Sequence, residues 1–282
     1  YGPSFISALL DLDDDGDLDV YLTYDFGQMF QPNHVLLNDT AGPGAPLKFT
    51  DVSALSGADI ADNPMGIAWG DYDLDGRMDL YLTGNQNANH LLHNQTKPGG
   101  PLQFLDVGVQ TGTYKNGKGY VSWGAQFVDS DNKGALDLYV VNGKIASPLE
   151  KFAGKPMTIV EAQADQLWWQ NDSGLFGEVG ADAGLTALGW KRSVQRADFD
   201  GDGFVDLAVG SVWGPALLYR NGCNGNAWLT VRLQGKGHNT DDQKSLAHGH
   251  CRLFVGLGFR QDAHLDGAAQ LLRSGVPGGL VG

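Results

Sequence analysis

The sequence predicts an all-β protein assembled from repeated four-stranded antiparallel sheets. An Asp-rich stretch of nine residues recurs four times, each copy lies between short apolar segments, and glycine is abundant, with 41 residues in 282. Of the 33 acidic residues only three are Glu, and Asp favours turns and metal ligation over helices. These features are typical of a turn-rich β repeat protein.

The segments around each Asp-rich stretch have the composition of β-strands. The stretches are DLDDDGDLD, DYDLDGRMD, DSDNKGALD and DFDGDGFVD, at residues 11–19, 71–79, 129–137 and 198–206. GIAWG before the second stretch and LYLTG after it predict a β-hairpin with the stretch as its loop, and the other three repeat this arrangement. An EF-hand is excluded, because its position-twelve Glu is replaced by Leu22, Leu82, Val140 and Val209.

Two further strand-like segments follow the hairpins. NHVLLND, NHLLHNQ, DQLWWQND and GPALLYRN supply a third strand, and LKFTDV, LQFLDV and LFGEVG supply a fourth strand in three repeats. The Asp-rich stretches begin 60, 58 and 69 residues apart, which suits one four-stranded sheet with its turns. We therefore expect blades of a β-propeller, with four visible and an incomplete arc as an alternative to a closed ring, followed by a short β or irregular segment.

The third repeat carries an insertion between its second and third strands, at residues 143–165. Because antiparallel strands alternate in direction, this insertion should emerge on the face opposite the Asp-rich loops, where it is a candidate recognition element. The candidate partner-binding residues in and beside it are Lys144, Phe152, Trp168 and Trp169. A loop that packs on a neighbouring blade, and tryptophans that pack in the core, are the alternatives.

The Asp-rich loops have the chemistry of calcium sites. Ca²⁺ takes six to eight oxygen ligands, and alternate carboxylates on a tight glycine turn can converge on one ion. Side-chain ligands are predicted at positions one, three, five and nine of the first, second and fourth loops: Asp11, Asp13, Asp15, Asp19; Asp71, Asp73, Asp75, Asp79; and Asp198, Asp200, Asp202, Asp206. The backbone carbonyls of Asp17, Arg77 and Phe204 are predicted at position seven.

The third loop departs from this pattern. It retains Asp129, Asp131 and Asp137, but Lys133 stands at position five. A fourth calcium ion and replacement of the ion by the Lys133 ammonium are the two alternatives, and we favour the second. We thus expect three calcium ions.

The net charge of −14 and the pI of about 4.6 exclude binding to nucleic acid or to an anionic membrane surface as the leading function. No apolar run is long enough to span a membrane. Cys223 and Cys251 allow two interpretations, one disulfide or two free thiols. Calcium sites of moderate affinity fill where calcium is millimolar, so we expect an extracellular, periplasmic or cell-surface location.

Asparagines recur at the end of the predicted third strands. Asn38, Asn94 and Asn171 head the triplets NDT, NQT and NDS. Their recurrence favours an Asx turn over glycosylation.

These residues resemble the FG-GAP or VCBS repeats of integrin α-type propellers, whose blades carry a D-x-D-x-D-G-x-x-D hairpin loop. The resemblance covers residues 1–221 and implies calcium-binding propeller blades. Segments of residues 222–282, such as NAWLTVRLQGKG, resemble the ASPIC/UnbV segment of the cartilage acidic protein family. The resemblance implies an adhesion or protein-binding role, with a protein or glycan partner on the face opposite the calcium loops, or a place in a larger surface complex.

No catalytic motif accompanies these repeats. The sequence has no G-x-S-x-G, no H-E-x-x-H and no P-loop, and calcium binding already explains the paired carboxylates. We therefore expect an interaction or assembly module rather than an enzyme. A propeller hydrolase or lyase acting on polysaccharide is the alternative.

Overall fold

The computed structural model describes residues 2–84, 88–114, 119–144, 162–222 and 226, and the backbone of 228–232 and 270–275. Residues 145–161 of the insertion, which include Phe152, and both cysteines lie outside the described residues.

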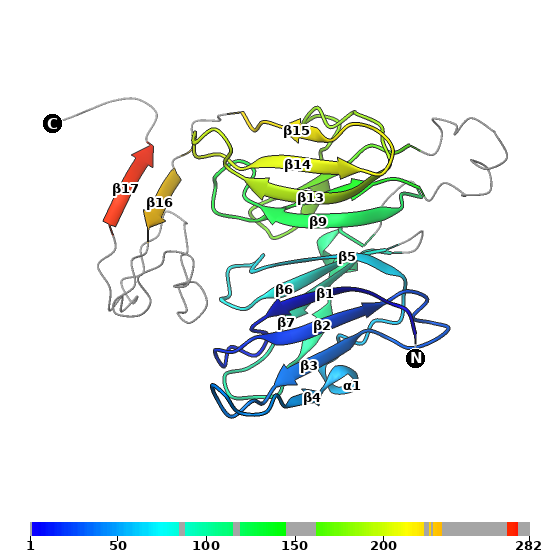
Figure 1. The fold of residues 1–282 in the computed structure, drawn as a ribbon. Helices are drawn as coiled ribbons and strands as arrows, with labels where there is room; N and C mark the ends of the chain where they lie inside the picture. The colour runs from blue at the N-terminus through cyan, green and yellow to red at the C-terminus, as the bar shows by residue number, and fades with distance from the viewer. Residues whose placement is uncertain are drawn as a thin grey trace.

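The described chain folds into successive antiparallel sheets, which we call blades (Figure 1). The first blade has the strand order β1-β2-β3-β4: Ser4–Leu10, Asp19–Tyr24, His34–Asn38 and Phe49–Asp51. The second has the order β5-β6-β7-β8: Pro64–Gly70, Asp79–Gly84, His90–Asn94 and Phe104–Asp106. Two single-turn helices, α1 (Ser53–Ser56) and α2 (Gly108–Thr111), follow the outer strands of these blades.

The third and fourth blades repeat this order. The third consists of β9 (Ser122–Val128), β10 (Asp137–Asn142), β11 (Gln166–Gln170) and β12 (Phe176–Glu178). The fourth has three described strands, β13 (Lys191–Ala197), β14 (Asp206–Ser211) and β15 (Leu217–Tyr219). The predicted all-β class and the repeated antiparallel sheets are confirmed.

The first strands of the blades lie side by side, since β1 contacts β5, β5 contacts β9, and β9 contacts β13. The Asp-rich loops join the first and second strands of each blade, so all four emerge at the same end of the sheets. A hairpin of β16 (Trp228–Arg232) and β17 (Gln270–Gly275) follows the blades and lies beside them at the left of Figure 1. Asn226, just before this hairpin, donates from Nδ2 to the carbonyl of Asp131 at 2.6 Å, which places it on the loop side.

Three apolar clusters fill the spaces between consecutive blades. Successive residues of a strand point to opposite faces, so alternate positions of each second strand serve different clusters. In the second blade, Leu80 and Leu82 face the first blade, while Tyr81 faces the third. The equivalent tyrosines Tyr21 and Tyr139 are also fully buried, so the tyrosine after each of the first three loops packs between blades.

One buried ion pair joins the third and fourth blades. Lys191 Nζ lies 2.9 Å from Asp165 Oδ2, and both side chains are at most 1% exposed. Tyr139 donates its hydroxyl to the same carboxylate at 2.6 Å. Removal of either charge alone would leave an uncompensated buried ion, so this pair fixes how the two blades pack.

The first blade leaves one face open. Most of its outward positions are equivalent to second-blade positions that pack against the first blade, but no blade lies beyond them in the described chain. This open face of the first blade consists of Leu9, Leu18, Val20, Leu22, Leu36, Leu47 and Phe49.

No helix of the described residues has the length and hydropathy needed to cross a bilayer.

Candidate metal centres

The four Asp-rich loops share one backbone arrangement. The aspartate at position one accepts hydrogen bonds from the backbone N–H groups of positions five and six. In the second loop, Asp75 N donates to Asp71 Oδ1 at 2.9 Å and Gly76 N donates to Asp71 Oδ2 at 2.8 Å. The same pair of bonds is made by Asp11, Asp129 and Asp198. Four different sequences therefore form one turn.

The turn needs two left-handed residues. Position six is glycine in all four loops, and Gly76 has φ +89°. Position four is also left-handed, at Asp14, Leu74, Asn132 and Gly201. Leu74 has φ +61°, which is uncommon for a residue other than glycine, asparagine or aspartate. The sequence indicated the glycine but not this second position.

The aspartate at position nine connects its loop to the third strand of the blade. Asp79 Oδ2 accepts from Tyr72 N at 3.1 Å, and Asp79 Oδ1 accepts from Asn94 N at 2.8 Å. Asp19, Asp137 and Asp206 make the equivalent pair of bonds. All four are buried, so the predicted ligand at position nine also has a structural role.

Each loop concentrates negative charge in a partly desolvated place. Burial raises the pKa of Asp19 and of Asp79 to about 6. Burial, followed by the charges of Asp15 and Asp11, raises the pKa of Asp13, and burial likewise raises those of Asp71 and Asp73. These directions mean that ionised carboxylates are costly here without a cation between them.

The first loop fits a calcium ion most directly. Asp11, Asp13 and Asp15 each offer an oxygen within 4.8 Å of the others. Asp13 Oδ1 is buried without a hydrogen-bond partner, and its sequence DLDDDGDLD supplies no basic residue. A buried carboxylate oxygen without a donor is the feature a hard cation would satisfy.

The second and fourth loops contain similar convergent groups. Asp71, Asp73 and Asp75 form one, and Asp198, Asp200 and Asp206 form another. At position seven, the backbone N–H groups of Asp17, Arg77 and Phe204 donate to the position-five carboxylates of their own loops. Their carbonyls remain predicted calcium ligands.

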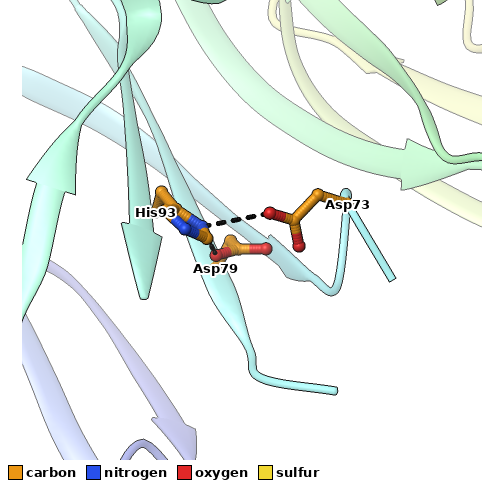
Figure 2. Close-up of side chains that lie close together, drawn as sticks. All are labelled: Asp73, Asp79 and His93. Atoms are coloured by element: carbon orange, nitrogen blue, oxygen red, sulfur yellow. Dashed lines mark hydrogen bonds and ion pairs between the residues drawn. The ribbon is translucent and has the colours of Figure 1, made fainter. Parts of the chain in front are cut away.

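The second loop has two additional residues at its carboxylates. Arg77 forms an ion pair with Asp75 through Nη2 and donates from Nε to the carbonyl of Asn94 at 2.6 Å. His93, near the end of β7, places Nδ1 3.2 Å from Asp79 Oδ1 and 3.4 Å from Asp73 Oδ2. Figure 2 shows these three side chains pointing toward one another. The hydrogen bond to Asp79 raises the pKa of His93.

The third loop holds its own cation. Lys133 donates from Nζ to the carbonyl of Gln170 and lies 3.7 Å from Asp131 Oδ2. The ammonium also lies 3.6 Å from the centre of the Trp169 ring. Among the described residues, the third loop is the one Asp-rich loop without a group of three convergent ligands. This geometry supports the predicted replacement of an ion by Lys133.

A cationic side chain also covers the fourth loop. Arg220 forms ion pairs through Nε with Asp200 and through Nη2 with Asp202. Arg220, His93 and Trp169 occupy the same repeat position, directly before the residue whose N–H donates to the position-nine aspartate, and Leu37 occupies it in the first blade. We call these four the cover residues. Sequence reasoning missed their contact with the loops, although aligning the four third strands would have revealed the position.

In the second, third and fourth blades, the residue after the cover residue connects neighbouring loops. Asn94 donates from Nδ2 to the carbonyl of Leu12 in the first loop at 2.9 Å. Gln170 donates to the carbonyl of Tyr72 at 3.1 Å, and Asn221 to that of Ser130 at 2.7 Å. We call these three the interblade amides. They link the first, second and third Asp-rich loops to the next blade.

The predicted Asx turns are present. Asn38, Asn94 and Asn171 each accept a backbone hydrogen bond from the residue two positions later, at 3.1, 3.0 and 2.9 Å. Asn171 is nevertheless not the equivalent of Asn94, since Gln170 occupies that position in the strand register.

Two predicted partner-binding residues lie elsewhere than expected. Trp168 is 6% exposed and packs between the second and third blades. Trp169 is 38% exposed, but its Nε1 donates to Asp131 Oδ2 at 3.1 Å, on the side of the Asp-rich loops. The prediction placed both beside the insertion, whereas β11 carries them to the opposite end. Lys144 is exposed after β10, and its partner-binding role stays a prediction.

Comparison with known families gives one match. Residues 11–82 match the FG-GAP-like repeat, a span that includes the first two Asp-rich loops. No curated protein matches the chain. Together, the repeat match and the series of all-antiparallel sheets fit a β-propeller of the FG-GAP/VCBS repeat type.

Proposed function

We propose that the protein is an extracytoplasmic interaction module whose blades are stabilised by calcium. FG-GAP-like repeats suggest an interaction module. The observation that carries the calcium proposal is the first loop, where several carboxylates converge and Asp13 Oδ1 is buried without a hydrogen-bond partner.

Calcium would be held in the first loop by Asp11, Asp13, Asp15 and Asp19, with the carbonyl of Asp17. Equivalent residues would hold it in the second and fourth loops. Bound calcium supplies positive charge that neutralises the carboxylates and fixes the turn. Because Asn94 bonds to the carbonyl of Leu12, a fixed first loop also fixes its contact with the second blade.

The partner surface that we propose is the open face of the first blade. Leu47 is 80% exposed there, and its neighbours on β1 to β4 are apolar. Contiguous apolar surface of this kind marks protein interaction sites. We propose that another apolar sheet face packs on it, as the second blade packs on the first.

Calcium titration followed by thermal unfolding tests the proposal. An ion bound only by the folded state adds about 2.7 kcal/mol when free calcium is a hundredfold above its Kd. The Tm should therefore rise by at least about 5 °C in calcium relative to excess chelator. Magnesium, which demands a tighter octahedral site, should give a smaller rise.

A matched pair of variants locates the effect. Asp13→Asn removes a first-loop ligand and should lower the calcium stoichiometry measured by calorimetry. Asp182→Asn removes the same charge from an exposed position outside the loops and should leave calcium binding unchanged. Identical melting curves in calcium, magnesium and chelator would sink the calcium proposal.

A further inference from the structure

We propose that the second loop binds a transition metal ion such as Zn²⁺ or Co²⁺ through Asp73, Asp79 and His93. Imidazole nitrogen suits zinc, cobalt and nickel, whereas calcium selects oxygen ligands. His93 therefore gives the second loop a ligand that a calcium site does not use. The proposal rests on this loop being a metal site, as in the proposed function, but assigns it a different metal.

The distances fit the coordination geometry of zinc. Two ligand atoms about 2.0–2.2 Å from a tetrahedral ion lie roughly 3.3–3.5 Å apart. His93 Nδ1 lies 3.2 Å from Asp79 Oδ1 and 3.4 Å from Asp73 Oδ2. The three ligand atoms all lie within 4.8 Å of one another, and Figure 2 shows them directed at a common point.

The surroundings hold these ligands in place. Both oxygens of Asp79 accept backbone hydrogen bonds, and its side chain is fully buried. The ring of Tyr72 meets the imidazole of His93 edge-on, with centroids 6.0 Å apart. The site is therefore built on β6 and β7, and Asp73 of the loop completes it from the solvent side.

Arg77 shifts the balance between the two metals. Its ion pair with Asp75 occupies the position-five carboxylate, which is a ligand of the calcium set but not of the set with His93. Asp73 and Asp79 belong to both sets, so the two metals compete for this loop. Zinc should displace calcium from the second loop and leave the first loop unaffected, since Leu37 stands at the cover position there.

The cover residues supply matched variants for the test. His93→Leu installs the residue found in the first blade and removes the nitrogen ligand without touching an aspartate. Leu37→His installs the nitrogen ligand beside Asp13 and Asp19. The probes are Co²⁺ alone, followed by its visible absorption bands, and Zn²⁺ alone, followed by calorimetry.

The wild-type chain should give intense Co²⁺ bands of a four- or five-coordinate site with nitrogen ligation. His93→Leu should abolish those bands and weaken zinc binding at this site by at least about tenfold, with calcium binding to the first loop retained. Leu37→His should add a second set of bands. All variants are full chains with the same histidines elsewhere, so zinc bound at those histidines cancels when the variants are compared.

Equal Co²⁺ spectra and equal zinc affinities in the wild type and His93→Leu would overturn the proposal and leave His93 as a hydrogen-bonding partner of the carboxylates. Failure of the calcium proposal would give a different result. If the chain binds no calcium but shows Co²⁺ bands that depend on His93, this inference stands and the calcium proposal fails.

Discussion

The first and second blades have nearly the same sequence plan but different surroundings. Leu102 is 4% exposed and Phe104 is 7% exposed in the second blade, whereas the equivalent Leu47 and Phe49 in the first are 80% and 40% exposed. The second blade lies between two neighbours, and the first has one among the described residues. Position in the stack, rather than the strand sequence, thus decides how much each apolar side chain contributes to stability.

The largest expected effect comes from truncating the same third-strand leucine to alanine in each of the two blades. Leu92→Ala removes a fully buried side chain between the first two blades and should lower the free energy of unfolding by about 2–5 kcal/mol. Leu36→Ala removes its half-buried equivalent and should cost roughly 1 kcal/mol or less. Denaturant unfolding measures both. Equal losses would show that the open face is covered in solution.

The histidine that begins the third strand should make stability depend on pH in the second blade. His90 Nδ1 lies 2.7 Å from Asp106 Oδ2, and His90 Nε2 lies 3.3 Å from Asp62 Oδ2. Burial works against its charged form, but the hydrogen bonds that the ring donates to Asp106 and Asp62 outweigh it and raise the pKa of His90 to about 9. The equivalent His34 pairs with one carboxylate, its Nδ1 lying 3.2 Å from Asp51 Oδ2.

Because the folded pKa of His90 exceeds its unfolded value of about 6.5, its stabilisation is complete below pH 6.5 and is lost as pH rises through 9. The effect should be on the order of 2 kcal/mol. When the free energy of unfolding is measured at pH 6, 7.5 and 9, it should fall less steeply with rising pH in His90→Gln than in the wild type. If His90→Gln leaves the pH dependence of the unfolding free energy unchanged and His34→Gln reduces it, the prediction is wrong and the effect belongs to the first blade.

The asparagines at the end of the third strands offer the next comparison. Asn94→Ala leaves the carbonyl of Leu12 and the N–H of Thr96 without their partners in a buried place, which should cost about 1–3 kcal/mol. Asn38→Ala removes bonds to Leu18 and Thr40 in a more exposed place and should cost less. Amide exchange of the first loop should accelerate more in Asn94→Ala than in Asn38→Ala, since Asn38 does not bridge two blades.

The hairpin loops are predictable from the sequence because their information is local. Nine consecutive residues encode the turn, its glycine and the position-one and position-nine carboxylates. The inward tyrosines are predictable for a related reason, because alternation along a strand fixes which face a residue joins. The replacement of the position-five aspartate by Lys133 in the third loop is equally local, since it lies within the same nine residues.

The contacts made by the third strand are not predictable in this way. His93 lies 14 residues beyond Asp79 in the chain, and only the register of β7 against β6 brings it to the loop. The predicted place of Trp169 is wrong because adjacency to the insertion in sequence does not mean adjacency in space. The open face is not predictable either, since the exposure of Leu47 depends on which blade stands next to it.

The smallest expected effect concerns the open face itself. Leu47→Ser replaces a side chain that is 80% exposed and should change the free energy of unfolding by less than about 0.5 kcal/mol. Leu102→Ser, at the buried equivalent, should cost several-fold more. If Leu47→Ser instead lowers the Tm, and the wild-type Tm rises with protein concentration, copies of the chain cover this face for one another. An unchanged Tm at every concentration leaves the face free for a different protein, and the comparison between the two blades then holds for the isolated chain.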